Sequence, residues 1–176
     1  MATHQINNIS IAVPAHVIEY AKRRCLEGAS QAWTEEICPI VVTAGLGVKA
    51  ADPVTALHGF AMRPANNDAG GISLLEYVLA IDGLVLIGNH LDTDGTDNTL
   101  VQADFGALRQ LNETASIGPG STTVWHLGDS ATTAAAYTID QDGDYFPAPT
   151  EPTYTKVGDV NARVPFVVKA SVKAWA

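Results

Sequence analysis

The stretch from Ala51 to Asn67 constrains the fold most strongly, because chain-breaking residues bracket an apolar segment. Asp52-Pro53 interrupts whatever precedes it, and Pro64 with the asparagines that follow favours a turn. Apolar residues occupy both alternating sets of positions between Val54 and Met62, which is typical of a strand covered on both faces. Gly59 suits a point where another backbone or a bulky side chain comes close. The stretch therefore predicts a central strand of a β-rich domain.

Length and composition indicate one mostly β domain. A chain of 176 residues can bury one sizeable core but is short for two ordinary domains. Its 15 glycines and 9 prolines indicate short strands joined by tight turns. Because no regular helices separate the candidate strands, a barrel or sandwich is favoured over a sheet with crossover helices. We predict a mainly β fold, an antiparallel β-barrel or sandwich, with an extended N-terminal arm and room for one short helix.

The N-terminal part has a weaker pattern than the rest. We expect residues 1–40 to form an arm and connecting segment, and residues 41–176 to form the β-rich domain. From Ile9 to Val13 the apolar residues alternate, as in a short strand or extended arm. The segment from His16 to Gly28 has apolar residues at helical spacing, yet its first part could equally be a strand. We leave both alternatives open there.

Three further segments carry local signals. Asp82-Gly83 separates the apolar runs Glu76 to Ile81 and Leu84 to Leu91, and this dipeptide favours a two-residue hairpin. The segment from Asp104 to Glu113 is expected to form a turn or short helix. Alternating apolar and polar residues from Ala162 to Trp175 predict a long closing strand with one solvated face.

The net charge of −9 is unevenly distributed along the chain. Residues 66–159 hold 14 acids and 2 bases, a sum of −12, and the remainder holds 5 acids and 8 bases, a sum of +3. An acidic body argues against nucleic-acid binding. No run of 18 apolar residues indicates a membrane span, and the first ten residues lack the pattern of a signal peptide. We therefore expect a soluble protein that binds neither nucleic acid nor a membrane.

One acidic segment has the spacing of a calcium loop. Asp140, Asp142 and Asp144 occupy the first, third and fifth positions of such a loop, and Glu151 occupies the twelfth. However, Tyr145 stands where that loop needs glycine, and no helix pattern flanks it. We interpret the segment as an acidic turn that binds no metal. The weaker acidic turn containing Asp92, Asp94 and Asp97 has the same interpretation.

No catalytic, cofactor or metal residues are assigned from the sequence. The five histidines are scattered and form no metal-binding motif (His4, His16, His58, His90 and His126). His58 and His90 lie within apolar strands, where a lone histidine is expected in the core or across a strand pair. Cys25 and Cys38 are expected to be packed free thiols. Trp33 and Trp175 could stack on a sugar if they lay side by side, although Trp is also enriched in subunit contacts. We therefore predict no enzymatic activity.

The order of strands and turns resembles that of capsid decoration, or cement, proteins of tailed bacteriophages. The resemblance is carried by ALHGFA (Ala56 to Ala61) and the Asn- and Gly-rich loop after it, EYVLAIDGLVLIGNHL (Glu76 to Leu91), LVQADFG (Leu100 to Gly106), the strand with Val124-Trp125, and NARVPFVVKASV (Asn161 to Val172). It covers roughly two-thirds of the chain, from Ala51 onward, whereas the segment from His16 to Trp33 departs from it.

The resemblance implies a structural protein of the virion, made in the host cytoplasm. Its partner would be the major capsid protein, which it would bind as a homo-oligomer, with a trimer as our guess, across junctions between shell subunits. We expect an N-terminal set of residues to contribute contacts by strand addition and charge (Ile6, Ile9, Ile11, Val13, Lys22, Arg23, Arg24 and Trp33). The alternative is a ligand- or carbohydrate-binding β-module of a virion or surface protein.

Overall fold

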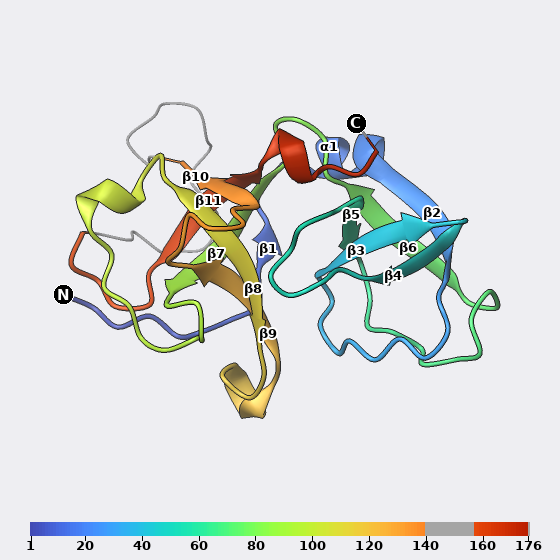
Figure 1. Ribbon diagram of the computed structural model, residues 1–176, viewed down its shortest axis with the longest axis horizontal. Helices are drawn as coiled ribbons and strands as arrows, with labels where there is room; N and C mark the ends of the chain where they lie inside the picture. The colour runs from blue at the N-terminus through green and yellow to red at the C-terminus, as the bar shows by residue number, and fades with distance from the viewer. Residues whose placement is uncertain (140–156, 176) are drawn as a thin grey trace.

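The computed structural model describes residues 1–139 and 157–175, which form two β units lying side by side (Figure 1). A closed barrel lies on the right of the view, and a larger sheet lies on the left. The mainly β fold predicted from the sequence is thereby confirmed. The segment with calcium-loop spacing, Asp140 to Glu151, lies outside the described residues.

The barrel is built from five short strands. They are β2 (Lys22–Glu27), β3 (Cys38–Thr43), β4 (Leu46–Lys49), β5 (Gly59–Ala61) and β6 (Leu74–Leu79). They close in the order β2-β4-β3-β5-β6, and every neighbouring pair is antiparallel except β2 and β4. Closure leaves the barrel without a free edge, so pairing groups are not offered to another chain here.

The stretch from Ala51 to Asn67 enters the barrel between β3 and β6, as its pattern predicts, but only three of its residues form a strand. Val54, Leu57 and Phe60 are fully buried, which explains the apolar residues on both alternating sets. A Cβ placed on Gly59 would lie 2.2 Å from the backbone oxygen of Val78. The close approach expected at this glycine is therefore present.

β3 and β4 form a tight hairpin. Thr43 pairs with Leu46, and the two residues between them, Ala44 and Gly45, both have positive φ angles, of 50° and 81°. Positive φ at both central positions characterises the hairpin turns whose twist matches that of the flanking strands.

The second sheet has six strands. They are β1 (Ser10–Ile11), β7 (Val85–Leu91), β8 (Leu108–Thr114), β9 (Val124–Gly128), β10 (Ala136–Thr138) and β11 (Arg163–Val168). Their order is β1-β7-β11-β10-β8-β9, and β9 also pairs with β7 in parallel. This last pairing brings two distant strands of the sheet together, so the sheet curls back on itself.

The hairpin predicted around Asp82-Gly83 is wrong. β6 pairs with β2 and β5 in the barrel, whereas β7 pairs with β1, β9 and β11 in the second sheet. The turn exists, with Gly83 at a φ of 79°, but it carries the chain from one β unit to the other. A tight turn determines only that the chain changes direction. The partners of the two strands are determined by pairing with segments that are distant in the sequence.

Two other segments differ from their predicted form. The segment from Asp104 to Glu113 is mostly β8, and its helical part is confined to a 3₁₀ turn at Gln102–Asp104. The closing strand ends at Val168 and is followed by another 3₁₀ turn, Ala170–Val172; a further 3₁₀ turn, Pro119–Ser121, precedes β9. The chain at the end of the Ala170–Val172 turn pairs with Leu57, since Leu57 N donates to Val172 O and Ala174 N donates to Leu57 O, both at 2.8 Å.

The ambiguous segment from His16 to Gly28 contains both alternatives. α1 (Ala15–Ala21) is the one α-helix of the described residues, and β2 follows it directly. The strand forms because its backbone pairs with β6 along its length and with β4 at its end. Tertiary pairing thus overrides the helical spacing of the apolar residues.

The first forty residues contribute to both β units. β1 joins the second sheet, β2 joins the barrel, and the predicted division at residue 40 falls inside β3. No helix in the described part of the chain has the length and apolar character needed to cross a membrane.

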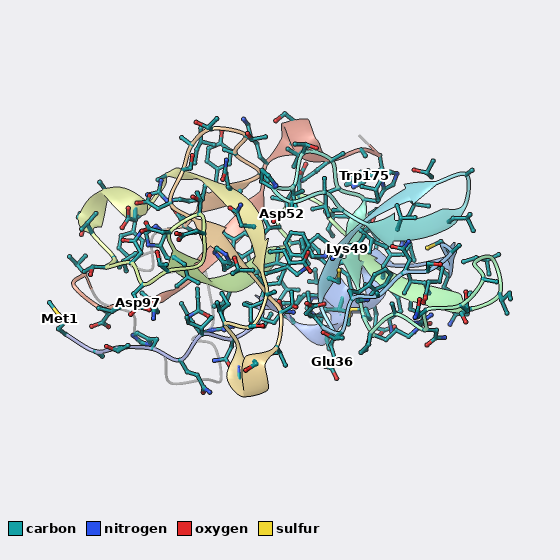
Figure 2. The ribbon with its side chains drawn as sticks, turned by 60° about the horizontal axis from the view of Figure 1, so that its bottom comes forward. Met1, Glu36, Lys49, Asp52, Asp97 and Trp175 are labelled. Atoms are coloured by element: carbon teal, nitrogen blue, oxygen red, sulfur yellow. The ribbon has the colours of Figure 1, made fainter. Side chains whose placement is uncertain are left out.

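Main-chain and charged contacts fasten the two units together. Val54 N donates to Leu111 O at 3.0 Å, and Lys49 Nζ lies 2.8 Å from a carboxylate oxygen of Glu113. Asp52 accepts a hydrogen bond of 3.0 Å from Glu113 N. Figure 2 shows Lys49 and Asp52 between the barrel and the second sheet. The interior is continuous, since one cluster of buried apolar residues includes Phe60 of the barrel and Phe166 of the second sheet.

Candidate functional site

The basic residues predicted to contact a partner lie at the start of β2. Arg23 and Arg24 are exposed, while Lys22 is half-buried. Arg24 is 2.8 Å from Glu76 on β6, and Lys22 is 2.6 Å from Glu19. Two of these three cations are therefore neutralised locally by a carboxylate. Arg23 instead donates to main-chain oxygens, including that of Tyr20 at 2.9 Å. These neutral acceptors do not balance its positive charge.

The N-terminal arm packs on its own chain. Ile9 is buried, and its three predicted companions are half-buried (Ile6, Ile11 and Val13). Asn8 links the two β units, since its side chain donates to Ile37 O at 2.8 Å and accepts from Trp125 N at 2.9 Å. In this structure the arm is thus a brace between the barrel and the second sheet. Its role in partner contact stays a prediction.

The tryptophans do not form a stacking platform. Trp33 is 2% exposed, and its indole donates to Arg63 O at 2.8 Å. Trp125 is fully buried, whereas Trp175 is 39% exposed near the C-terminal end of the described chain (Figure 2). Because Trp33 is inside the core of its own chain, it can neither pair with Trp175 on a sugar nor reach a partner.

A row of leucines crosses the outer side of the barrel, and the sequence patterns did not reveal it. Leu26 of β2 lies opposite Leu74 of β6 and opposite Leu46 of β4, and directly paired residues project to the same side of a sheet. Leu26 is 39% exposed and Leu74 is 53% exposed, while Leu46 is half-buried. Ile72, two residues before Leu74, is 71% exposed. We call these four residues the leucine face.

The local signal for this face is an adjacent pair of leucines. Leu74 and Leu75 are neighbours in a strand, so only one of them can point into the barrel. Leu75 is fully buried and Leu74 is not. The leucine pair does not reveal the whole face, because Leu26, the other half of the exposed pair, lies on β2.

A second group of residues gathers in the curled sheet. The parallel pairing of β7 with β9 places Leu91 opposite Gly128, so His90 of β7 comes near Asp129, which follows β9. Asp104, at the end of the 3₁₀ turn, faces the other side of the imidazole. Nδ1 of the ring lies 3.9 Å from a carboxylate oxygen of Asp104, and Nε2 lies 3.8 Å from a carboxylate oxygen of Asp129. Arg109 of β8 lies 2.6 Å from Asp104 and 3.4 Å from Asp129.

Burial and the neighbouring charges both act on His90. Burial lowers the pKa of its imidazole, Asp104 and Asp129 oppose this effect, and Arg109 reinforces it. Nearby, burial also lowers the pKa of His126, whose Nε2 is 3.0 Å from the hydroxyl of Thr114. The prediction that His90 is a buried strand residue is confirmed. Its convergence with two carboxylates was not predicted.

The cysteines are not activated. Cys25 is half-buried and Cys38 is buried, and both are free thiols. Burial raises the pKa of each thiol above its usual value. Since the thiolate is the nucleophilic form, neither side chain is suited to attack a substrate at neutral pH.

Comparison of this chain with family models, with curated proteins and with solved structures finds no match.

Proposed function

We propose that this protein is a virion structural protein that decorates and stabilises a tailed-bacteriophage capsid by binding across shell subunits. In this role it acts through contact area and carries out no bond-making. Its partner is the major capsid protein, and it binds as a homo-oligomer, for which we expect a trimer. The single observation that supports the proposal best is the leucine face, an exposed apolar surface on a rigid and closed barrel.

The leucine face has the composition of a protein contact. Leu26, Leu46 and Leu74 lie on paired strands, and Ile72 is exposed two residues before Leu74. Arg24 lies on the same side of β2 as Leu26, two residues before it. Apolar residues with arginine at the margin are typical of the centre and rim of protein interfaces. Because the barrel is closed, recognition here would use side chains and not added strands.

The rest of the molecule suits repeated binding on a lattice. Its net charge of −9 keeps free copies soluble and apart. The arm and the contacts at Lys49 and Leu57 hold the barrel and second sheet in one arrangement, so little conformational freedom is lost on binding. Many modest contacts per head would then add through avidity.

The proposal can be tested by measuring attachment to purified expanded heads of the virus that carries this chain, after the protein has been stripped from them. The purified protein is added back, the heads are sedimented, and bound copies are counted. We expect stoichiometric occupancy of repeated sites on the shell. Leu26→Asp should reduce the apparent affinity at least about tenfold, because it puts an unpaired charge into an apolar contact.

Val101→Asp is the matched control, since Val101 is 49% exposed and belongs to the second sheet side of the molecule. It introduces the same charge outside the leucine face, so occupancy should stay at the level of the unchanged protein. Absence of the protein from sedimented heads would refute the proposed function. Equal occupancy for Leu26→Asp and Val101→Asp would refute the role of the leucine face.

A further inference from the structure

The group formed by His90, Asp104 and Asp129 has a feature that packing alone does not explain. The side chain of His90 is 1% exposed, yet neither of its ring nitrogens has a hydrogen-bond partner among the described residues. The nearest carboxylate oxygens lie at 3.9 and 3.8 Å, which is beyond hydrogen-bonding distance. A buried imidazole normally has a partner for at least one nitrogen. Here the nitrogens face carboxylates across a gap.

We propose that His90, Asp104 and Asp129 bind one divalent transition-metal ion, with Zn²⁺ as the best match. One ring nitrogen and one oxygen from each carboxylate lie within 4.8 Å of one another. In tetrahedral zinc sites with bonds of about 2.0–2.1 Å, ligand atoms are about 3.3 Å apart. The gaps of 3.9 and 3.8 Å involve different ring nitrogens, Nδ1 toward Asp104 and Nε2 toward Asp129. Because one ion takes one of these nitrogens, ligand atoms up to 4.8 Å apart must approach one another by as much as about 1.5 Å, which rotation of the side chains can provide.

The two carboxylates are already held in place by other groups. Asp104 accepts hydrogen bonds of 2.6 Å from Val101 N and 2.6 Å from Arg109. One oxygen of Asp129 accepts from the side chain of Asn98 at 3.2 Å, and its other oxygen lies 3.4 Å from Arg109 and 3.8 Å from His90. Donors of this kind orient metal-binding carboxylates in known sites. These hydrogen bonds would thus hold both carboxylates near the imidazole, and only the final approach to the ion remains.

Solvent reaches the group from one side. The side chain of Asp129 is 40% exposed, whereas those of His90 and Asp104 are almost fully buried. An ion could enter past Asp129, and water could occupy the fourth position of a tetrahedral site. Three protein ligands and one open position characterise zinc sites of the catalytic type.

The ligands, and not the charge, distinguish zinc from calcium here. Two carboxylates and the guanidinium of Arg109 sum to −1 while His90 is neutral, so a divalent ion brings the group to +1. Calcium prefers six to eight oxygen ligands, which this group does not offer. An imidazole nitrogen favours zinc and its neighbours in the transition series. We therefore expect zinc to bind and calcium not to compete. This inference does not depend on the proposed function.

The experiment uses the full chain, treated with a chelator and then dialysed. Zinc binding is measured by calorimetry, and the melting temperature is measured with zinc, with calcium and with neither. We expect one high-affinity zinc ion per chain and a melting temperature that rises by several degrees with zinc and is unchanged with calcium. Absence of zinc binding, or an equal response to calcium, would overturn the proposal.

Asp129→Asn is the decisive variant, because this ligand is partly exposed and its loss should leave the fold intact. It should weaken zinc binding at least about tenfold. His16→Ala and Cys25→Ser are the controls, because each removes a side chain of a type that can bind zinc but that lies outside the proposed site. Each should leave the zinc affinity unchanged. His16 is exposed and Cys25 is half-buried in the barrel. Unchanged affinity in Asp129→Asn, or a loss in either control, would place the ion elsewhere and refute the assignment.

Discussion

Gly59→Ala provides a direct test of the barrel, because the added methyl group has no space. Its carbon would lie 2.2 Å from Val78 O and 2.8 Å from a ring carbon of Tyr77. Ordinary contacts at a Cβ begin at 3.4 Å. The backbone of β6 would therefore have to retreat by roughly 1 Å at its pairing with β5, and overpacking of this kind costs about 3 kcal/mol. The lower entropy of the unfolded alanine chain offsets about 0.5–1 kcal/mol.

The expected net loss is about 2 kcal/mol in the free energy of unfolding, or about 4–8 °C in melting temperature for a chain of this size. Urea denaturation followed by fluorescence measures it. Gly88→Ala in β7 is the matched strand control, because its nearest neighbours are side-chain atoms of Ile9 and Phe166 at 3.1 and 3.2 Å, which can yield slightly. Its cost should stay below about 1 kcal/mol. A loss below about 0.5 kcal/mol for Gly59→Ala would refute the close approach of β5 and β6.

Two further predictions follow from buried histidines and from the β3–β4 turn. Burial lowers the pKa of His90 and His126 below the ordinary value of about 6.5. The unfolded chain then binds more protons than the folded chain as the pH decreases, so stability is lost in acid. The urea concentration at the unfolding midpoint should therefore decrease when the pH is lowered from about 7.5 to about 5.5, and an unchanged midpoint would contradict this. Ala44→Gly should raise the free energy of unfolding by about 0.5–1 kcal/mol, since Ala44 has a φ of 50° that glycine adopts without strain. Destabilisation in the same urea assay would show that the turn conformation is different.

Local patterns were sufficient for burial and for turns, but not for strand partners. The apolar pattern around Phe60 correctly indicated a segment covered on both sides, and Gly59 correctly indicated a close approach. Asp82-Gly83 correctly indicated a turn. The partners of β6 and β7 depend on residues far away in the sequence, such as Arg24 and Val164. A two-residue turn contains no information about those partners.

The same limitation explains why the sequence patterns did not predict the group formed by the side chains of His90, Asp104 and Asp129, called the polar group below. His90, Asp104 and Asp129 are separated in the sequence and match no metal-binding spacing. They meet because β9 returns to pair with β7 in parallel, and no local signal predicts that pairing. The leucine face is intermediate, since Leu74-Leu75 shows locally that one leucine must point outward. Its partner Leu26 became apparent only when the segment after α1 proved to be a strand.

The leucine face and the polar group lie in different β units, which separates the two proposals experimentally. Leu26 and Leu74 belong to the barrel, whereas His90 and Asp129 belong to the second sheet, and within residues 1–139 and 157–175 the two pairs share no hydrogen bond or ion pair. Effects of substitutions at sites without shared partners generally add. Leu26→Asp therefore reports on capsid attachment and Asp129→Asn reports on zinc, so either proposal can fail while the other stands.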